Sequence, residues 1–150
     1  MNYYPYLKLA HVLFAIVALG SNLTYPVWLQ RAQRSPEYLP FTLRSIYFLD
    51  SYVANPAYVL GLLSGLTMVW LAGHDWRNLW ISGAMGLFAA VAVLGYGLYT
   101  PGLRRQIAAL DQHGYDSPEY RRIQRRQTGL GIVLGILVIL ILVLMLLKPV

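Results

Sequence analysis

Residues 128–147 read TGLGIVLGILVILILVLMLL, a run of about twenty residues without a charged side chain. A helix rises about 1.5 Å per residue, so such a run spans the roughly 30 Å hydrocarbon core of a bilayer. Three further apolar runs of similar length occupy residues 6–29, 53–72 and 79–99. The pattern predicts an all-α membrane protein, a bundle of four transmembrane helices that forms a single integral membrane domain over residues 1–150.

The overall composition supports this class and excludes others. Hydrophobic residues make up 57% of the 150 residues and charged residues 12%, about half the usual share in soluble domains. We therefore expect no soluble catalytic domain. Cysteine is absent, which excludes disulfides, thiolate metal sites, iron–sulfur ligation and a cysteine nucleophile. No basic stretch precedes the first apolar run and no small-x-small cleavage site follows it, so we expect a retained helix.

The basic residues predict how the chain crosses the membrane. Nine of the twelve Lys and Arg residues lie in the connectors after the first and third predicted helices, and only Lys8, Arg77 and Lys148 lie on the opposite side. The positive-inside rule then places both connectors in the cytoplasm and both termini outside, an N-out and C-out topology in a bacterial inner membrane. The formal charge of +6 predicts contact with anionic lipids at the cytoplasmic face, and not with nucleic acid, because no soluble fold presents the charge.

The connectors carry local signals as well. Ser117 and Pro118 read as the cap and first residue of a helix that runs into the last span, and residues 103–112 read as an extension of the third helix. Residues 41–51 have apolar and charged residues at helical spacing, which predicts a helix along the membrane interface. Asp50 lies at the edge of the second predicted span, so no span contains a carboxylate, which argues against a proton-coupled transporter.

His11 is the most unusual residue of the predicted spans. An ionisable residue inside the membrane is a functional hypothesis by default. Lys8 lies one turn earlier on the same helix face, from which it can reach the outer surface. The alternative is a histidine that is hydrogen-bonded to a neighbouring helix, and the sequence leaves both interpretations open.

Three methionines lie at the same depth as His11. At 1.5 Å per residue, His11, Met68, Met85 and Met145 all fall within roughly 3 to 9 Å of the outer boundary. One imidazole and several thioethers could bind Cu(I), or His11 and a methionine could be the axial ligands of heme b. The competing interpretation is that the methionines fill gaps between helices. His74 and His113 lie in opposite connectors, which argues against a bis-histidine heme within one chain.

The order of features resembles a known group. The start YLKLAH at residues 6–11, Gly20-Ser21-Asn22, the connector YRRIQRR at residues 120–126 and the ending Leu147-Lys148-Pro149 resemble a bacterial family of predicted integral membrane proteins of unknown function. More remotely, the pattern is similar to the copper-resistance D family and to the heme-binding protoporphyrinogen oxidase family of bacteria. That similarity implies heme or copper contacts at His11 and Lys148. The oxidase family has a further histidine soon after its first helix, which this chain lacks, so the resemblance implies no reaction.

A second functional class fits the same sequence. A short chain with a smooth aliphatic last helix and few acidic residues is typical of a non-catalytic accessory or assembly subunit in a larger membrane complex of respiratory or photosynthetic type. Small-residue pairs such as Gly61 and Gly65 favour close packing of helices within the bundle, and a homo-oligomer is the alternative for such a chain. A channel or carrier is the weakest alternative because no polar stripe runs through the spans.

Overall fold

The computed structural model describes residues 2–148, which form helices joined by short connectors and contain no strand. The elements form four columns, each of which is one helix or an unbroken series of helical segments. The first and last columns are the single helices α1 (Tyr4–Gln33) and α6 (Pro118–Leu147). The second column runs without a break through the short 3₁₀ turn η1 (Pro36–Tyr38), α2 (Leu39–Leu49), η2 (Asp50–Ala54) and α3 (Asn55–Leu71). The third runs through α4 (Leu79–Leu94), η3 (Gly95–Tyr99) and α5 (Thr100–His113). All four columns are long and apolar enough to cross a membrane, which confirms the predicted fold class.

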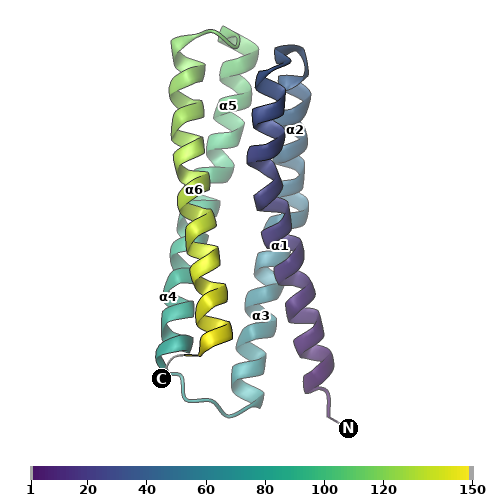
Figure 1. Cartoon of the computed structure of the whole chain (residues 1–150), viewed down its shortest axis with the longest axis vertical. Helices are drawn as coiled ribbons and strands as arrows, with labels where there is room; N and C mark the ends of the chain where they lie inside the picture. The colour runs from purple at the N-terminus through teal and green to yellow at the C-terminus, as the bar shows by residue number, and fades with distance from the viewer. Residues whose placement is uncertain (1, 149–150) are drawn as a thin grey trace.

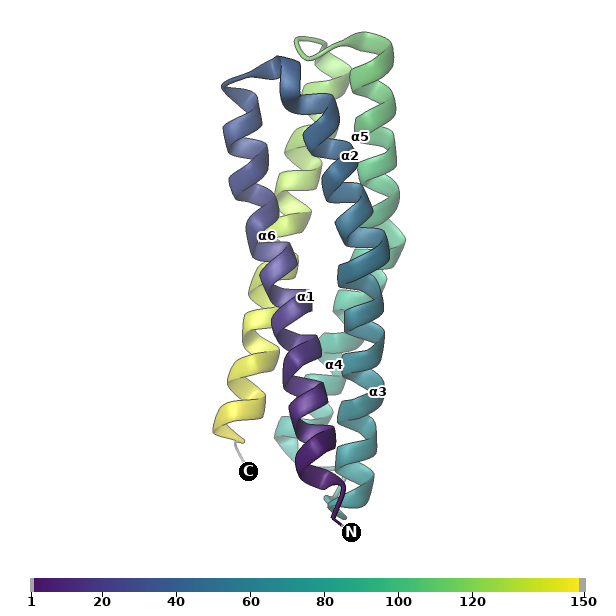
Figure 2. The same ribbon diagram turned by 90° about the vertical axis from the view of Figure 1, so that its right-hand side faces the viewer.

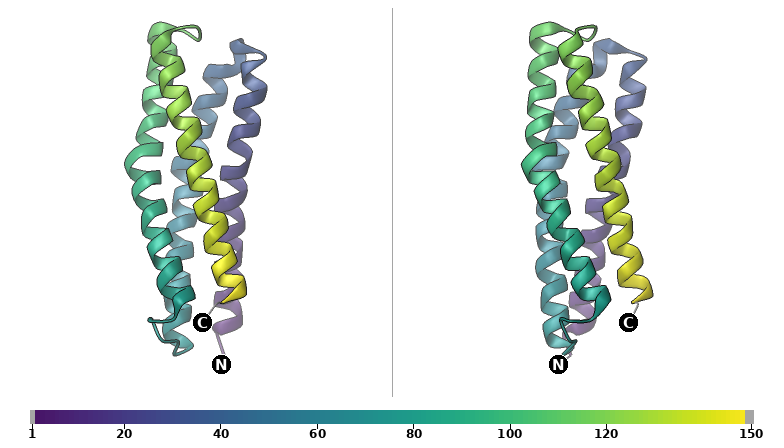
Figure 3. Two further views of the ribbon diagram at one scale, coloured as in Figure 1. Left: turned by 60° about the vertical axis from the view of Figure 1, so that its left-hand side comes forward. Right: turned by 90° about the vertical axis from the view of Figure 1, so that its left-hand side faces the viewer.

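The four columns lie lengthwise beside one another as two pairs. In Figures 1 and 2, α1 follows the column of α2 and α3, and α6 follows the column of α4 and α5. Both termini lie at the end that carries the connector between α3 and α4, and the other two connectors lie at the opposite end, as the further views in Figure 3 also show. The termini therefore share one side as predicted, while the assignment of that side to the outside stays a prediction.

The columns are longer than the predicted spans. Their 30 to 36 residues correspond to roughly 45–54 Å, against a hydrocarbon core of about 30 Å. The extra turns lie at the end away from the termini, where the basic residues gather. Residues 103–112 do extend the third column, as expected, because α5 continues to His113.

The expectation of an interfacial helix at residues 41–51 is wrong. This segment forms α2 and η2, which continue directly into α3 and stand upright in the bundle. The reason is the spacing of Leu39, Leu43 and Ile46, which fall on one face of the helix and are at most 1% exposed. Leu39 and Leu43 join a core cluster with Leu110 of α5. Burial of these leucines against α5 therefore stabilises the upright position of α2 more than contact with the membrane surface would stabilise a flat position.

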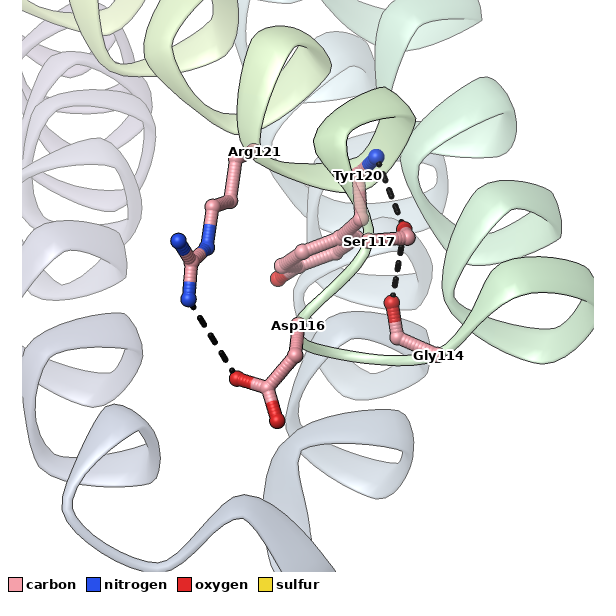
Figure 4. A network of polar contacts seen from close by, with 5 residues as sticks. All are labelled: Gly114, Asp116, Ser117, Tyr120 and Arg121. Carbon is pink, nitrogen blue, oxygen red and sulfur yellow. Dashed lines mark hydrogen bonds and ion pairs between the residues drawn. The ribbon is translucent and has the colours of Figure 1, made fainter.

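The start of α6 follows the predicted cap. The Ser117 hydroxyl accepts a hydrogen bond from the Tyr120 backbone N–H at 3.2 Å and donates one to the Gly114 carbonyl oxygen at 2.9 Å (Figure 4). Pro118 occupies the first helical position, where no N–H is needed. Arg121 adds an exposed ion pair with Asp116 at 3.4 Å. The first turn of the last column is thus fixed by residues that are next to it in sequence.

Both two-part columns contain one π-helical segment, and a proline explains each. η2 ends two residues before Pro56, and η3 ends two residues before Pro101. Proline has no N–H to donate, and its ring collides with the carbonyl group four residues earlier, so the preceding turn must widen. The two wide turns lie at a similar height in adjacent columns, since the residues in front of the two prolines, Asn55 and Thr100, are hydrogen-bonded to each other at 3.3 Å.

Candidate functional site

His11 links the first two columns near the end that carries the termini. Its Nδ1 atom lies 2.9 Å from the Gly61 carbonyl oxygen and 3.0 Å from Ser64 Oγ, both on α3. A carbonyl oxygen can only accept, so this contact places a hydrogen on Nδ1 and leaves the lone pair of the neutral ring on Nε2. The interhelical hydrogen bond is therefore present, and it uses only one of the two ring nitrogens.

The glycines of α3 make room for the histidine ring. A Cβ atom on Gly65 would lie 3.0 Å from His11 Cε1, and one on Gly61 would lie 3.7 Å from Phe14 Cβ. The Gly61 and Gly65 pair thus lets α1 approach closely, which is the packing role that small residues have in membrane bundles. The same approach holds the ring against α3 in one orientation.

A cavity of about 110 Å³ lies beside His11, between α1, α3, α4 and α6. Met85 of α4 and Met145 of α6 line it together with His11, and Trp80 and Phe88 contribute aromatic walls. Apart from His11 and the Tyr58 hydroxyl, the side chains that line it are apolar, since the indole of Trp80 is largely hydrocarbon. One imidazole and two methionine side chains therefore border the same apolar cavity, and Met85 is also 38% exposed at the surface of the bundle.

The remaining predicted site residues lie around this cavity rather than in its wall. Met68 is half-buried on α3, one turn beyond Ser64, and is not among the lining residues. Lys8 is exposed on α1. The Lys148 ammonium lies 5.3 Å from the centre of the Trp80 ring, a cation–π contact at the end of α6. Lys148 therefore contacts a residue of the cavity wall, whereas Lys8 faces the surroundings.

A second polar cluster, which we call the Asp50 cluster, lies at the two π-helical segments. Its members are Asn22, Asp50, Asn55, Tyr58, Tyr96, Tyr99 and Thr100. The Thr100 hydroxyl donates to Asp50 Oδ2 at 2.6 Å, the Tyr96 hydroxyl donates to the Asn55 carbonyl oxygen at 2.9 Å, and the Asn22 amide donates to the Tyr58 hydroxyl at 2.6 Å. Asp50 is only 3% exposed.

Sequence reasoning missed this cluster because the burial of the Asp50 side chain depends on contacts with other helices. Asp50 lies in the continuous second column, about 32 Å from its end at Leu71, which is close to the roughly 30 Å thickness of the hydrocarbon core, so the predicted position at the edge of the span fits the structure. What the sequence did not reveal is that the bundle encloses this side chain. Two features of the sequence could have indicated this cluster, the Asn55-Pro56 and Thr100-Pro101 pairs, because each proline marks the place where its helix widens.

Four long apolar helices, each able to cross a bilayer, define a polytopic integral membrane protein. A family model described as predicted integral membrane protein (DUF2269) matches residues 5–149. The chain belongs to this family, whose function is unknown, and the first of the two resemblances is thereby confirmed. No curated protein and no solved structure matches the chain. None of these comparisons supports the remoter similarity to the copper-resistance D and protoporphyrinogen oxidase families.

Proposed function

We propose that this protein binds Cu(I) in the cavity beside His11, with His11 Nε2 and the thioether sulfurs of Met85 and Met145 as ligands. The observation that carries the proposal is the hydrogen bond from His11 Nδ1 to the Gly61 carbonyl oxygen, beside a cavity that two methionines also line. Metal-binding histidines almost always donate their other ring N–H to a carbonyl or carboxylate oxygen, which fixes the tautomer. Thioether ligands select Cu(I) over harder ions.

The size of the cavity favours copper over heme b. Pockets that hold drug-sized organic molecules measure about 300 Å³ or more, whereas this cavity measures about 110 Å³. A metal ion fits in that space and a porphyrin does not. Within the described residues no three His, Asp or Glu side chains form a cluster for a hard metal, so the ligand set rests on the two methionines.

The expected role is to hold copper in the outer half of the membrane. Apolar walls keep water away from the ion, and the hydrophobic shell around a metal tunes its redox potential. The fixed imidazole supplies one strong ligand, and the flexible thioethers of Met85 and Met145 can open and close around an ion. These properties suit a protein that stores copper or passes it on, and no catalytic step follows from them.

Copper binding is best tested with the full chain purified in mild detergent under reducing conditions. Cu(I) would be titrated against a chromophoric Cu(I) chelator, with wild type compared with His11→Ala and with the double variant Met85→Leu/Met145→Leu. We expect stoichiometric binding by wild type and at least a tenfold weaker affinity in both variants. The double variant keeps the His11 hydrogen bond, so weaker Cu(I) binding in this variant would reflect the loss of the sulfur ligands and not the loss of the fold.

Met68→Leu provides the matched control, because Met68 lies at a similar depth but outside the cavity wall. We expect it to bind copper like wild type. Wild-type protein that takes up no Cu(I), or a double variant that binds as tightly as wild type, would overturn the proposal. A Soret band in the protein from its own membrane would instead assign a heme, held through His11 with Lys8 and Lys148 near its propionates.

The accessory-subunit alternative stays a prediction. Exposed apolar residues such as Ile132, Ile136 and Ile139 on α6 can face lipid, a second copy or a larger complex equally well. The same purification tests this: stoichiometric partner proteins or a defined homo-oligomer would support it, and a small species with no partner would count against it.

We further infer an N-out and C-out topology in a bacterial inner membrane. The support is the gathering of arginines at the end opposite the termini, where they can reach anionic lipids of the cytoplasmic leaflet. The native chain has no cysteine, so His113→Cys gives a single labelling site. An impermeant thiol reagent added to intact cells should leave this site unlabelled and label it after lysis. Labelling in intact cells would reverse the topology.

A further inference from the structure

Asp50 is a carboxyl group enclosed by the bundle. The Thr100 hydroxyl donates to Asp50 Oδ2, and the Asn55 amide donates in turn to the Thr100 oxygen, so the chain of donors ends at the carboxyl group. The Thr100–Asp50 distance of 2.6 Å is that of a short hydrogen bond between two oxygens. Thr100 is therefore placed to stabilise a negative charge on Asp50.

The part of the chain that the structure describes gives this carboxylate no positive partner. The ion pairs found there, Arg44–Asp111 and Arg121–Asp116, are exposed and involve other acids. The titratable groups that lie near Asp50 are the neutral tyrosines Tyr25, Tyr58, Tyr96 and Tyr99. A buried charge without a partner is costly, so an ionised Asp50 would require a positive charge from outside the chain.

The structure also leaves space for such a charge. A cavity of about 40 Å³ adjoins Asp50, and four other side chains with oxygen atoms line it: Asn22, Asn55, Tyr58 and Tyr96. One bound water needs about 10–15 Å³ on this measure, so a bare or singly hydrated ion fits. Phe88, Val91 and Leu134 close the cavity with apolar surface.

We propose that the Asp50 cluster binds one Na⁺ ion in this cavity, coordinated by the Asp50 carboxylate and by neutral oxygens of Asn22, Asn55, Tyr58 and Tyr96. The cavity is lined by the Asp50 carboxylate, two asparagine amides and tyrosine hydroxyls, whose oxygen atoms suit a hard cation. A single carboxylate balances one positive charge, so the site matches a monovalent ion and not Mg²⁺ or Ca²⁺. Widened or broken helices are the places where membrane proteins bind Na⁺, and both columns widen at this height.

The test is the thermal stability of the full chain in detergent as NaCl replaces choline chloride at constant ionic strength. A ligand that binds only the folded state raises the melting temperature as its concentration exceeds its Kd. We expect the melting temperature of wild type to rise by several degrees with Na⁺ and that of Asp50→Asn to stay constant. Asp111→Asn is the matched control, because Asp111 is an exposed acid, and we expect it to respond like wild type.

A second variant covers the case in which Asp50→Asn does not fold. Tyr58→Phe removes one oxygen from the cavity and keeps the ring, so the Na⁺ concentration for the half-maximal rise should increase at least threefold. His11→Ala should leave the response to Na⁺ unchanged, which separates this site from the proposed copper site. Wild type that melts identically in Na⁺ and choline would overturn the proposal, and so would a melting temperature that depends on pH but not on Na⁺, which would assign a proton to Asp50.

Discussion

The two halves of the bundle, which the predicted topology makes the outer and the inner half, hold their polar groups in different ways. Around His11 the helices are regular, two glycines let α1 and α3 come close, and a single imidazole projects beside apolar walls. Around Asp50 two columns widen into π-helical turns, and a network of oxygens and amides lines a small cavity. Close packing thus leaves one imidazole beside an apolar cavity, whereas the widened helices gather several polar side chains around a carboxyl group.

The largest effect is expected at the inner half, from Asp50→Ala. The variant leaves the hydroxyl of the half-buried Thr100 without its acceptor and opens a space where the buried carboxyl group was, which together cost about 2 kcal/mol of the free energy of unfolding. Equilibrium unfolding in a denaturing detergent, with choline as the cation, measures it. A loss below about 0.5 kcal/mol would mean that Thr100 finds another acceptor and that the network is not rigid.

Gly65→Ala probes the close packing of the outer half. The new methyl group would lie 3.0 Å from the His11 ring, so the ring or the helix must shift, at a cost of about 1–2 kcal/mol. Copper affinity should fall with it, because the fixed orientation of the imidazole is lost. Gly86→Ala is the control, since a Cβ there meets open space, and it should leave both quantities unchanged.

Ser64→Ala is a milder change at the same contact. It removes one neighbour of His11 Nδ1 but keeps the Gly61 carbonyl oxygen, so we expect a loss of about 1 kcal/mol with copper binding retained. The same unfolding experiment and Cu(I) titration measure the two effects. Loss of copper binding in this variant would show that the serine, and not the carbonyl oxygen, fixes the tautomer.

The smallest effect is expected at the exposed surface of the bundle, from Arg44→Ala. Arg44 and Asp111 form an ion pair at 2.8 Å between α2 and α5, but their side chains are 57% and 45% exposed. Exposed pairs contribute about 0.5 kcal/mol and are screened by salt. Unfolding at low and high salt should therefore show a small difference that disappears at high salt. A large loss in the free energy of unfolding would show that this ion pair holds the two helix pairs together.

The four spans and the cap at Ser117 could be predicted from sequence because their signals are local. Hydropathy over about twenty residues and the order Ser-Pro-Glu need no knowledge of distant contacts. The depth of His11 and its possible link to a neighbouring helix followed from the same local arithmetic, and the hydrogen bond to Gly61 confirms the link.

The rest depends on contacts between residues far apart in the chain. Whether residues 41–51 lie flat or stand upright is decided by α5, which lies some sixty residues later and buries Leu43. Depth alone could not separate Met68 from Met145, because that requires the rotation of each helix about its axis. The burial of Asp50 depends on a proline in its own column and a threonine in the next.

The paired π-helical turns also act on the geometry of the whole bundle. Each wide turn accommodates one residue more than an α-helical turn, and one residue corresponds to about 100° of rotation around a helix axis. The two turns therefore rotate one part of each column relative to the other, which sets the faces of α3 and α4 that pack against the rest of the bundle. Deleting one residue from η2 would straighten that column and turn Gly61 and Ser64 away from α1, so the shape of the inner half decides whether the outer half has a site at all.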